Sequence, residues 1–213
     1  AFGTGQIFGV APQTPEVDYA AAKAHVADVI AGIAPHDSVE RFEGLGVRVI
    51  TEHGRFIGPQ TVKAGETEIT ARRIVIATGS TAFVPPIPGL SDVPYHTNET
   101  IFELLEKPEH LIIIGGGPIG LEMAQAHVRL GSQVTVLEGA RALGRDDPEM
   151  AAVALARLRA EGVTIVEGAK AKSVSGGGGA VTIETEGGTA YTGSHLLIAV
   201  GRKAVTDGLD LAK

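Results

Sequence analysis

The chain has 213 residues, 44% of them hydrophobic and 20% charged, which is ordinary globular composition and enough for one large domain or two small ones. Its net charge of -7 provides no basic face for nucleic acid, and no apolar run approaches transmembrane length, so neither nucleic acid nor a membrane is expected as a partner. The sequence has no cysteine and its 7 histidines lack metal-ligand spacing, so no metal site is expected, and nothing in the composition points away from the cytoplasm.

The first third of the chain is predicted to form one helix followed by short strands. Thr14, Pro15 and Glu16 make a helix start, and Pro35 stops the helix after Ile33. The apolar residues expected to face a core are Val26, Val29, Ile30 and Ile33. Strands are predicted at Val47–Thr51, Arg55–Ile57, Thr61–Lys63, Glu68–Thr70 and Arg72–Thr78, with a hairpin turn at Ala64–Glu66.

A proline-rich segment follows, from Thr81 to Pro94. Its prolines exclude a helix or a central strand, so we interpret the segment as a stiff link between two domains. A short helix is expected over Asn98–Leu105.

The stretch from Leu111 to Glu138 carries the strongest pattern in the chain. An apolar run, Leu111–Ile114, is typical of a parallel strand that is buried on both faces. Three glycines in the spacing G-x-G-x-x-G come next, then a helix that ends at Gly131, then a strand over Val134–Leu137. The helical residues expected to share one face are Ile119, Met123, Ala126 and Leu130.

Each part of this stretch has a physical role if a dinucleotide binds to it. Gly115 allows a tight turn, Gly117 lets the backbone approach a pyrophosphate, and Gly120 lets the helix pack close to the sheet. Free N–H groups and the positive end of the helix dipole hold the phosphates. Glu138 can accept hydrogen bonds from a ribose. The alternative is a merely flexible glycine turn, but the strand, helix, strand and acid around it favour the dinucleotide.

The rest of the domain is predicted to continue with a helix, a third parallel strand and an antiparallel meander. Asp147, Pro148 and Glu149 make a second helix start. The residues expected on its buried face are Met150, Val153, Ala154 and Leu158. The predicted strands are Val163–Val166, Lys170–Ser175, Ala180–Glu184, a third arm after Gly188, and Leu196–Val200. The four glycines at 176–179 are interpreted as a hairpin tip; the alternative is a disordered linker.

Two parts of the sequence echo each other. Ile74–Gly79 matches Leu196–Gly201, and each follows a predicted antiparallel meander. The second copy closes a domain that Gly115–Gly120 opens, whereas no such opening motif precedes the first copy. We therefore expect the chain to be a fragment that lacks at least one strand and its phosphate turn; the alternative is chance similarity between aliphatic strands.

At IATGS, VPPIPGL, IIIGGGPIGLEMAQ and IAVGR, the sequence resembles the FAD-dependent pyridine nucleotide-disulfide oxidoreductases. The branch that it resembles most contains mercuric reductase and dihydrolipoamide dehydrogenase. The resemblance implies an α/β fold of three parts. Residues 1–107 would be a partial FAD-binding domain, 108–202 a Rossmann-like NAD-binding domain with a parallel sheet and an antiparallel meander, and 203–213 a return segment toward the FAD domain.

The resemblance also implies cofactor contacts. Thr78, Gly79 and Ser80 would lie against FAD, and Gly54 would approach its adenosine half. The residues implied to hold the pyrophosphate of NAD are Gly115, Gly116, Gly117, Pro118, Ile119 and Gly120. Those implied to contact other parts of NAD are Glu138, Ala171 and Gly201.

Glu122 is the predicted catalytic residue, because the matching acid in the family pairs with a lysine near the flavin. The alternative for Glu122 is an ordinary exposed acid on a helix. After Gly201–Arg202 the chain has Lys203–Val205 where the family usually has proline and asparagine, so that loop matches less well.

The implied function is that of an NAD(P)H- and FAD-dependent oxidoreductase. The full-length protein, expected to be a cytoplasmic homodimer, would pass hydride from NADH to FAD and electrons on to a disulfide or metal-ion substrate. The family's first FAD glycine motif, its redox cysteine pair and its C-terminal dimerisation domain are not in these 213 residues, so this fragment alone is expected to be inactive. The alternative is a nucleotide-binding module, or a flavin reductase without disulfide chemistry.

Overall fold

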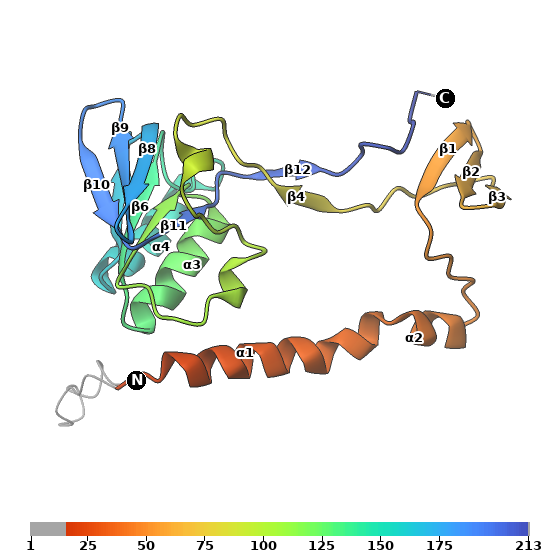
Figure 1. Cartoon of the computed structure of the whole chain (residues 1–213), viewed down its shortest axis with the longest axis horizontal. Coiled ribbons are helices and arrows are strands. Elements are labelled where there is room, and N and C mark those ends of the chain that lie inside the picture. Colours follow the sequence, from red (N-terminus) through yellow and green to blue (C-terminus); the bar gives the residue numbers. More distant parts are fainter. Residues whose placement is uncertain (1–15, 213) are drawn as a thin grey trace. The chain divides into compact units, whose positions relative to one another are not determined.

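The computed structural model of the chain describes residues 16–212, so the predicted helix start at Thr14 and Pro15 falls outside the described residues (Figure 1). The chain divides into two compact units. One contains the residues up to Ala27 together with Val84–Val200, and the other contains Asp28–Phe83 together with the residues from Gly201 on. No helix among the described residues has both the length and the apolar character needed to cross a membrane.

A parallel four-stranded sheet forms the centre of the first unit. Its strands lie in the order β11-β5-β6-β7. Their bounds are His110–Ile114 for β5, Gln133–Glu138 for β6, Thr164–Glu167 for β7 and His195–Ile198 for β11. Leu111, Ile112 and Ile113 of β5 are fully buried, as the unbroken apolar run predicts for a strand covered on both faces. The strands expected at these places are confirmed.

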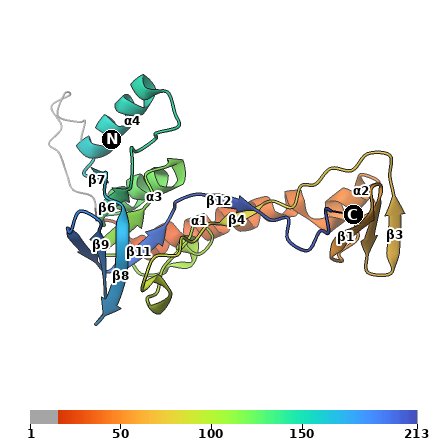
Figure 2. The same ribbon diagram turned by 90° about the horizontal axis from the view of Figure 1, so that it is seen from above.

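Two layers cover this sheet (Figure 2). Helices α3 (Pro118–Arg129) and α4 (Pro148–Ala160) cover one face, where Leu121 and Leu155 pack against Leu111 and Ile113. An antiparallel sheet in the order β10-β9-β8 covers the other face. Its strands are β8 (Ala171–Gly177), β9 (Ala180–Thr185) and β10 (Ala190–Gly193). The α/β class and the predicted meander are therefore confirmed, and the four glycines do form a hairpin tip.

The predicted helix faces are only partly right: Leu158 is buried and Met123 packs against the core, but most of the other predicted residues are not buried. α3 buries Gly120, Leu121, Ala124 and His127, whereas the predicted face is only partly buried. α4 buries Ala151, Leu155 and Leu158, and it leaves Met150 and Val153 each 68% exposed. The cap at Asp147 is confirmed, because its Oδ1 accepts from the N–H groups of Glu149 and Met150. Small residues such as Ala124 and Ala151 let the helices approach the sheet closely, and periodicity of large apolar residues alone misses them.

Glu161, which follows α4, joins the two helices at one end. Its carboxylate accepts from Arg129 of α3 at 2.7 Å and from Arg157 of α4 at 2.7 Å. The hydrogen bond from Arg129 is the largest cause of the fall in the pKa of Glu161 to about 2. The ion pair therefore remains formed well below neutral pH.

The division between the units falls between Phe83 and Val84, inside the predicted link Thr81–Pro94, and the segment from Val84 to Lys107 packs on the first unit. Leu90, Val93 and Ile101 are buried in its two core clusters, and Pro88 O accepts from Val174 N–H at 2.8 Å. The compact units thus differ from the predicted division at residue 107, because three buried aliphatic side chains hold this segment to the sheet. The short helix expected over Asn98–Leu105 is a single turn, Ile101–Glu103.

Helix α1 (Tyr19–Ile33) crosses the division between the units. It begins later than predicted, and Asp18 caps it by accepting from Ala21 N–H at 2.9 Å. Its buried residue is Tyr19, whereas Val29, Ile30 and Ile33, which were expected to face a core, are 46%, 55% and 55% exposed. That expectation is wrong within the described residues, where no partner element covers this face.

The second unit contains the remaining elements. After α1 come a single turn at Ala34–Asp37 and α2 (Val39–Gly44). A three-stranded antiparallel sheet follows, made of β1 (Gly54–Gly58), β2 (Thr61–Ala64) and β3 (Thr67–Thr70), with the predicted turn between β2 and β3 confirmed. A two-stranded ladder joins β4 (Ser80–Ala82) to β12 (Arg202–Ala204).

Two strands predicted in this unit do not form. Val47–Thr51 and Arg72–Thr78 are irregular, and no described strand pairs with either. Val75 is 87% exposed, although the matching residues of β11 are fully buried between β5 and a bridge at His96. An aliphatic sequence becomes a strand only when another backbone satisfies its N–H and C=O groups, and Ile74–Ala77 lacks one among the described residues.

Candidate functional site

The three glycines of the motif are needed in the turn from β5 to α3 for different reasons. A Cβ on Gly120 would lie 2.1 Å from Gly115 O, and one on Gly115, whose φ is 116°, would lie 2.4 Å from Ala199 O. Both positions therefore exclude a side chain in the folded protein. Gly117 differs: it has an ordinary φ of -80°, and a Cβ there would meet nothing within 4 Å.

Free donors surround the open space at Gly117. Gly117 is the N-cap of α3 and no side chain caps the helix. Pro118 has no N–H, Leu121 N–H bonds to Gly117 O, and the N–H groups of Ile119 and Gly120 have no acceptor among the described residues. Unsatisfied donors at a helix start, together with the helix dipole, form an anion site. The donors and the open space at Gly117 fit a pyrophosphate.

Glu138 lies beside this turn, as the sequence predicts. Its Oε2 accepts from Gly116 N–H at 2.7 Å and its Oε1 accepts from Ala140 N–H at 2.9 Å. The carboxylate therefore anchors the glycine turn in addition to any contact with a ribose. Each oxygen still has a lone pair to accept a further hydrogen bond.

The loop that follows β6 lies next to Glu138 and is fixed by hydrogen bonds. Ala142 is fully buried, and its N–H donates to Glu167 Oε1 at 2.9 Å. Leu143 has a positive φ of 51°, and its N–H donates to Gly116 O at 3.0 Å. Sequence reasoning missed Glu167, Ala142 and Leu143; the only available signal was an acid at the end of the third parallel strand.

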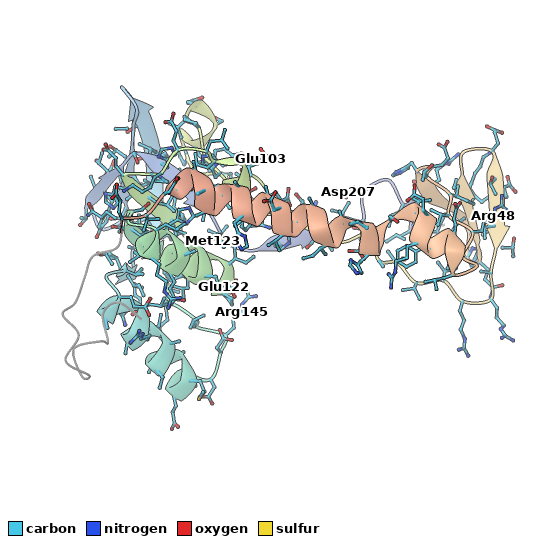
Figure 3. The ribbon with its side chains drawn as sticks, turned by 90° about the horizontal axis from the view of Figure 1, so that it is seen from below. Arg48, Glu103, Glu122, Met123, Arg145 and Asp207 are labelled. Atoms are coloured by element: carbon cyan, nitrogen blue, oxygen red, sulfur yellow. The ribbon has the colours of Figure 1, made fainter. Side chains whose placement is uncertain are left out.

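Two further residues that the sequence singled out, Ala171 and Glu122, lie in the same unit. Ala171 begins β8, and its side chain packs against the second core cluster. Glu122 is exposed on α3 (Figure 3), and it forms no ion pair or hydrogen bond with any described residue. Its assignment as a catalytic residue stays a prediction.

The second unit brings together the residues expected near FAD. Thr78 Oγ1 donates to Val205 O, Gly79 O accepts from Val205 N–H at 3.0 Å, and Ser80 Oγ accepts from Arg202 Nε at 2.7 Å. Gly79 has φ 72° and Gly201 has φ 137°, so both use glycine's conformational freedom. The segment Thr78–Ser80 is thus held by hydrogen bonds from residues more than one hundred positions later in the chain.

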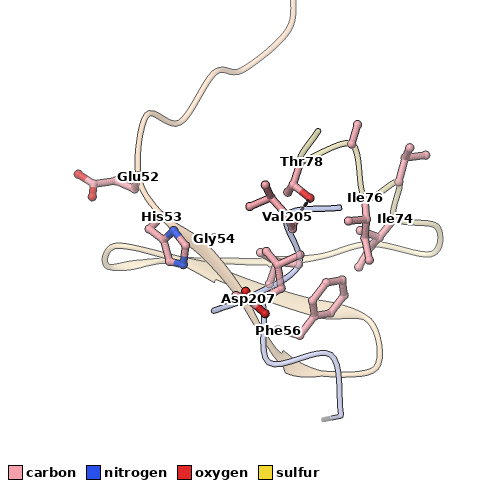
Figure 4. Close-up of a pocket in the computed structure, with 13 residues that line it drawn as sticks. Glu52, His53, Gly54, Phe56, Ile74, Ile76, Thr78, Val205 and Asp207 are labelled. Carbon is pink, nitrogen blue, oxygen red and sulfur yellow. Dashed lines mark hydrogen bonds between the residues drawn. The ribbon is translucent and has the colours of Figure 1, made fainter. Parts of the chain in front are cut away.

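An open groove of about 370 Å³ lies in the same unit (Figure 4). Its lining includes Gly54, Thr78 and the exposed aliphatic segment Ile74–Ala77. Within the described part of this unit, no strand leads through a glycine turn into a helix. The residues present therefore fit only one side of a flavin site. The described ones provide no helix start after a glycine turn, and so no free N–H donors of that kind to bind its pyrophosphate.

Comparison with known proteins matches the chain to one protein family. The family model described as pyridine nucleotide-disulphide oxidoreductase matches residues 7–213. The chain is 40% identical over 152 residues to mercuric reductase of Streptomyces lividans, covering 70% of this chain and 32% of that protein. It is 32% identical over 207 residues to mercuric reductase of Bacillus cereus, covering 95% and 33%.

Solved structures agree with these relatives. The HOCl-induced flavoprotein disulfide reductase RclA of Escherichia coli matches with a TM-score of 0.77 and 32% identity, covering 90% of this chain and 45% of that chain. LpdA of Mycobacterium tuberculosis matches with a TM-score of 0.79 and 26% identity, covering 93% and 46%. The chain thus spans about a third of the curated relatives' length and under half of the solved chains.

Gly117→Val is expected to abolish dinucleotide binding and to leave the fold intact. The space around Gly117 is open and its φ suits any residue, so the side chain displaces only a ligand. Gly177→Val is the matched control, because Gly177 is exposed, lies on the far hairpin and also has nothing within 4 Å of its Cβ position. Calorimetric titration with NADH and thermal melting of both variants test this. Normal binding by Gly117→Val would place the site elsewhere.

Proposed function

Because this chain belongs to the pyridine nucleotide-disulphide oxidoreductase family, we propose that it holds a nicotinamide cofactor at the β5–α3 turn and supplies one side of a flavin site. The whole protein would pass reducing equivalents from NADH through FAD to a disulfide or metal-ion substrate. The observation that carries the proposal is the open space at Gly117 beside the unpaired N–H groups of Ile119 and Gly120. The proposal includes a cytoplasmic location and a homodimer for the whole protein.

The chain's own contribution to the reaction is binding and orientation. The N-terminus of α3 would hold the pyrophosphate, and Glu138 would accept from the adenosine ribose. Ala171 would contact the adenosine side through its backbone, and Gly201 would lie near the nicotinamide. When bound, FAD supplies a centre that accepts hydride from the reduced nicotinamide.

The flavin side of the proposal rests on Thr78–Ser80 and Gly54. Hydrogen bonds with Arg202 and Val205 hold Thr78–Ser80 in place. Glu122 would act by pairing with a basic residue. Among the described residues, no basic side chain pairs with it. The 213 residues contain no cysteine, so they provide no thiol to receive electrons.

Relatives suggest two kinds of terminal substrate. The similarity to mercuric reductases supports a metal ion as the substrate of the whole protein, and the similarity to the flavoprotein disulfide reductase supports a disulfide. The second candidate for this chain is a nucleotide-binding module without redox turnover. The partly formed flavin side, with Val75 87% exposed, favours that candidate for these 213 residues on their own.

The cofactor is expected to be NADH in preference to NADPH. A 2′-phosphate beside Glu138 would face its charge, and two unit charges at about 4 Å repel by about 4 kcal/mol at an effective dielectric near 20, before solvent screening. Glu138→Gln removes the charge and keeps one oxygen acceptor for the glycine turn. The preference for NADH, measured by titration of both cofactors, should fall about tenfold, which corresponds to about 1.4 kcal/mol after screening. Equal affinities in the wild type would contradict the assignment.

The 213-residue chain should purify without colour, bind NADH and show no disulfide reductase activity. The helix start proposed to hold the pyrophosphate of NADH lies within the described residues, whereas no described helix start after a glycine turn is present for the pyrophosphate of FAD. The measurements are a visible spectrum after incubation with excess FAD and an assay of NADH consumption with a disulfide substrate. A stoichiometric flavin band, or turnover that depends on the disulfide, would contradict this account.

A further inference from the structure

Two carboxylates lie side by side at the end of the parallel sheet. Glu138 ends β6, Glu167 ends β7, and the two are register partners in the parallel ladder. Like charges on neighbouring strands are unfavourable. The pair is tolerated because each carboxylate accepts hydrogen bonds from backbone N–H groups of one loop, Gly139–Gly144.

Glu167 holds the middle of that loop. Its Oε1 accepts from Ala142 N–H at 2.9 Å and its Oε2 accepts from Arg159 at 3.0 Å. With Glu167 in place Ala142 is fully buried, and the Glu167 carboxylate, on a side chain that is 33% exposed, is the acceptor of its N–H. Without that acceptor the N–H would have to bond to water or to another group, and the loop would lose the contact that fixes its middle.

The same loop is joined to the glycine turn. Leu143 N–H donates to Gly116 O at 3.0 Å, while Gly116 N–H donates to Glu138 Oε2 at 2.7 Å. A Cβ on Gly116 would lie 3.1 Å from the Cβ of Ala142, so the loop and the turn are also in van der Waals contact. Leu143 keeps a left-handed φ of 51°, a conformation that persists only where the surroundings hold it.

We propose that Glu167 is a positioning residue for the adenosine half of the dinucleotide, acting through Ala142 and Leu143 on the glycine turn. The inference rests on the proposed function, because it concerns how the same site is shaped. Glu167 touches the loop rather than the ligand. Removing its acceptor atom should loosen the loop against Gly116 and Glu138 and so weaken the adenosine contacts.

The test compares five variants of the 213-residue chain. Glu167→Ala and Glu167→Met both remove the acceptor, and Met keeps the length of the side chain if Ala lowers stability. Glu167→Gln keeps an oxygen for Ala142 N–H. Arg159→Ala removes the ion pair and leaves the acceptor in place. Glu184→Ala is a matched control, because the Glu184 side chain is 45% exposed and is also ion-paired, but to Lys172 on the antiparallel sheet.

Affinities for NADH and AMP should fall about 3- to 10-fold in Glu167→Ala and Glu167→Met, as expected for the loss of one hydrogen bond. They should stay within about twofold of wild type in the Gln, Arg159 and Glu184 variants. The amide of Ala142 should exchange its hydrogen faster in the Glu167→Ala and Glu167→Met variants than in the wild type or in the other three variants.

The results that overturn the inference are distinct from those that overturn the proposed function. Wild-type affinity in Glu167→Met, or equal loss in Glu167→Gln and Glu167→Met, would show that the hydrogen bond to Ala142 does not shape the site. Unchanged exchange at Ala142 would show the same. Failure of the wild type to bind NADH would instead remove the proposed function.

Discussion

The close approach of α3 to β5 is the constraint on which the rest of the nucleotide unit depends. Gly120 lies so near Gly115 O that no side chain fits, and this contact sets the helix start at the carboxyl end of β5. The free N–H groups of Ile119 and Gly120 therefore point into the open space at Gly117. The sheet, both helices and the Gly139–Gly144 loop hold this arrangement, so the proposed anion site needs no rearrangement of the chain to receive a phosphate.

The sequence was most informative where structure is local. The glycine spacing, the cap at Asp147 and the strands of the parallel sheet follow from short-range rules, and each is present. Helix faces were misjudged because the buried positions include Ala124 and Ala151, and small residues contribute little to a hydrophobic pattern. Glu167 could not be found from sequence, because its hydrogen bond reaches Ala142 from 25 residues away.

The second unit shows how far a strand depends on its partner. Ile74–Ile76 and Leu196–Ile198 have nearly the same sequence, yet only the latter forms a strand, paired with β5. Among the described residues Ile74–Ile76 has no neighbour, and Val75 is 87% exposed. This contrast explains why the flavin side of the proposal rests on fewer observations than the nicotinamide side. Thr78–Ser80 are held in place by hydrogen bonds, but no described glycine turn faces them.

The central claim is that the pyrophosphate of a nicotinamide cofactor lies on the N-terminus of α3. The most direct test is a titration of the isotope-labelled chain with NADH, followed by the backbone amide resonances. The account predicts the largest shifts at Ile119 and Gly120, whose N–H groups have no acceptor in the protein. Shifts confined to residues 28–83 and 201–212, with none at the start of α3, would contradict it.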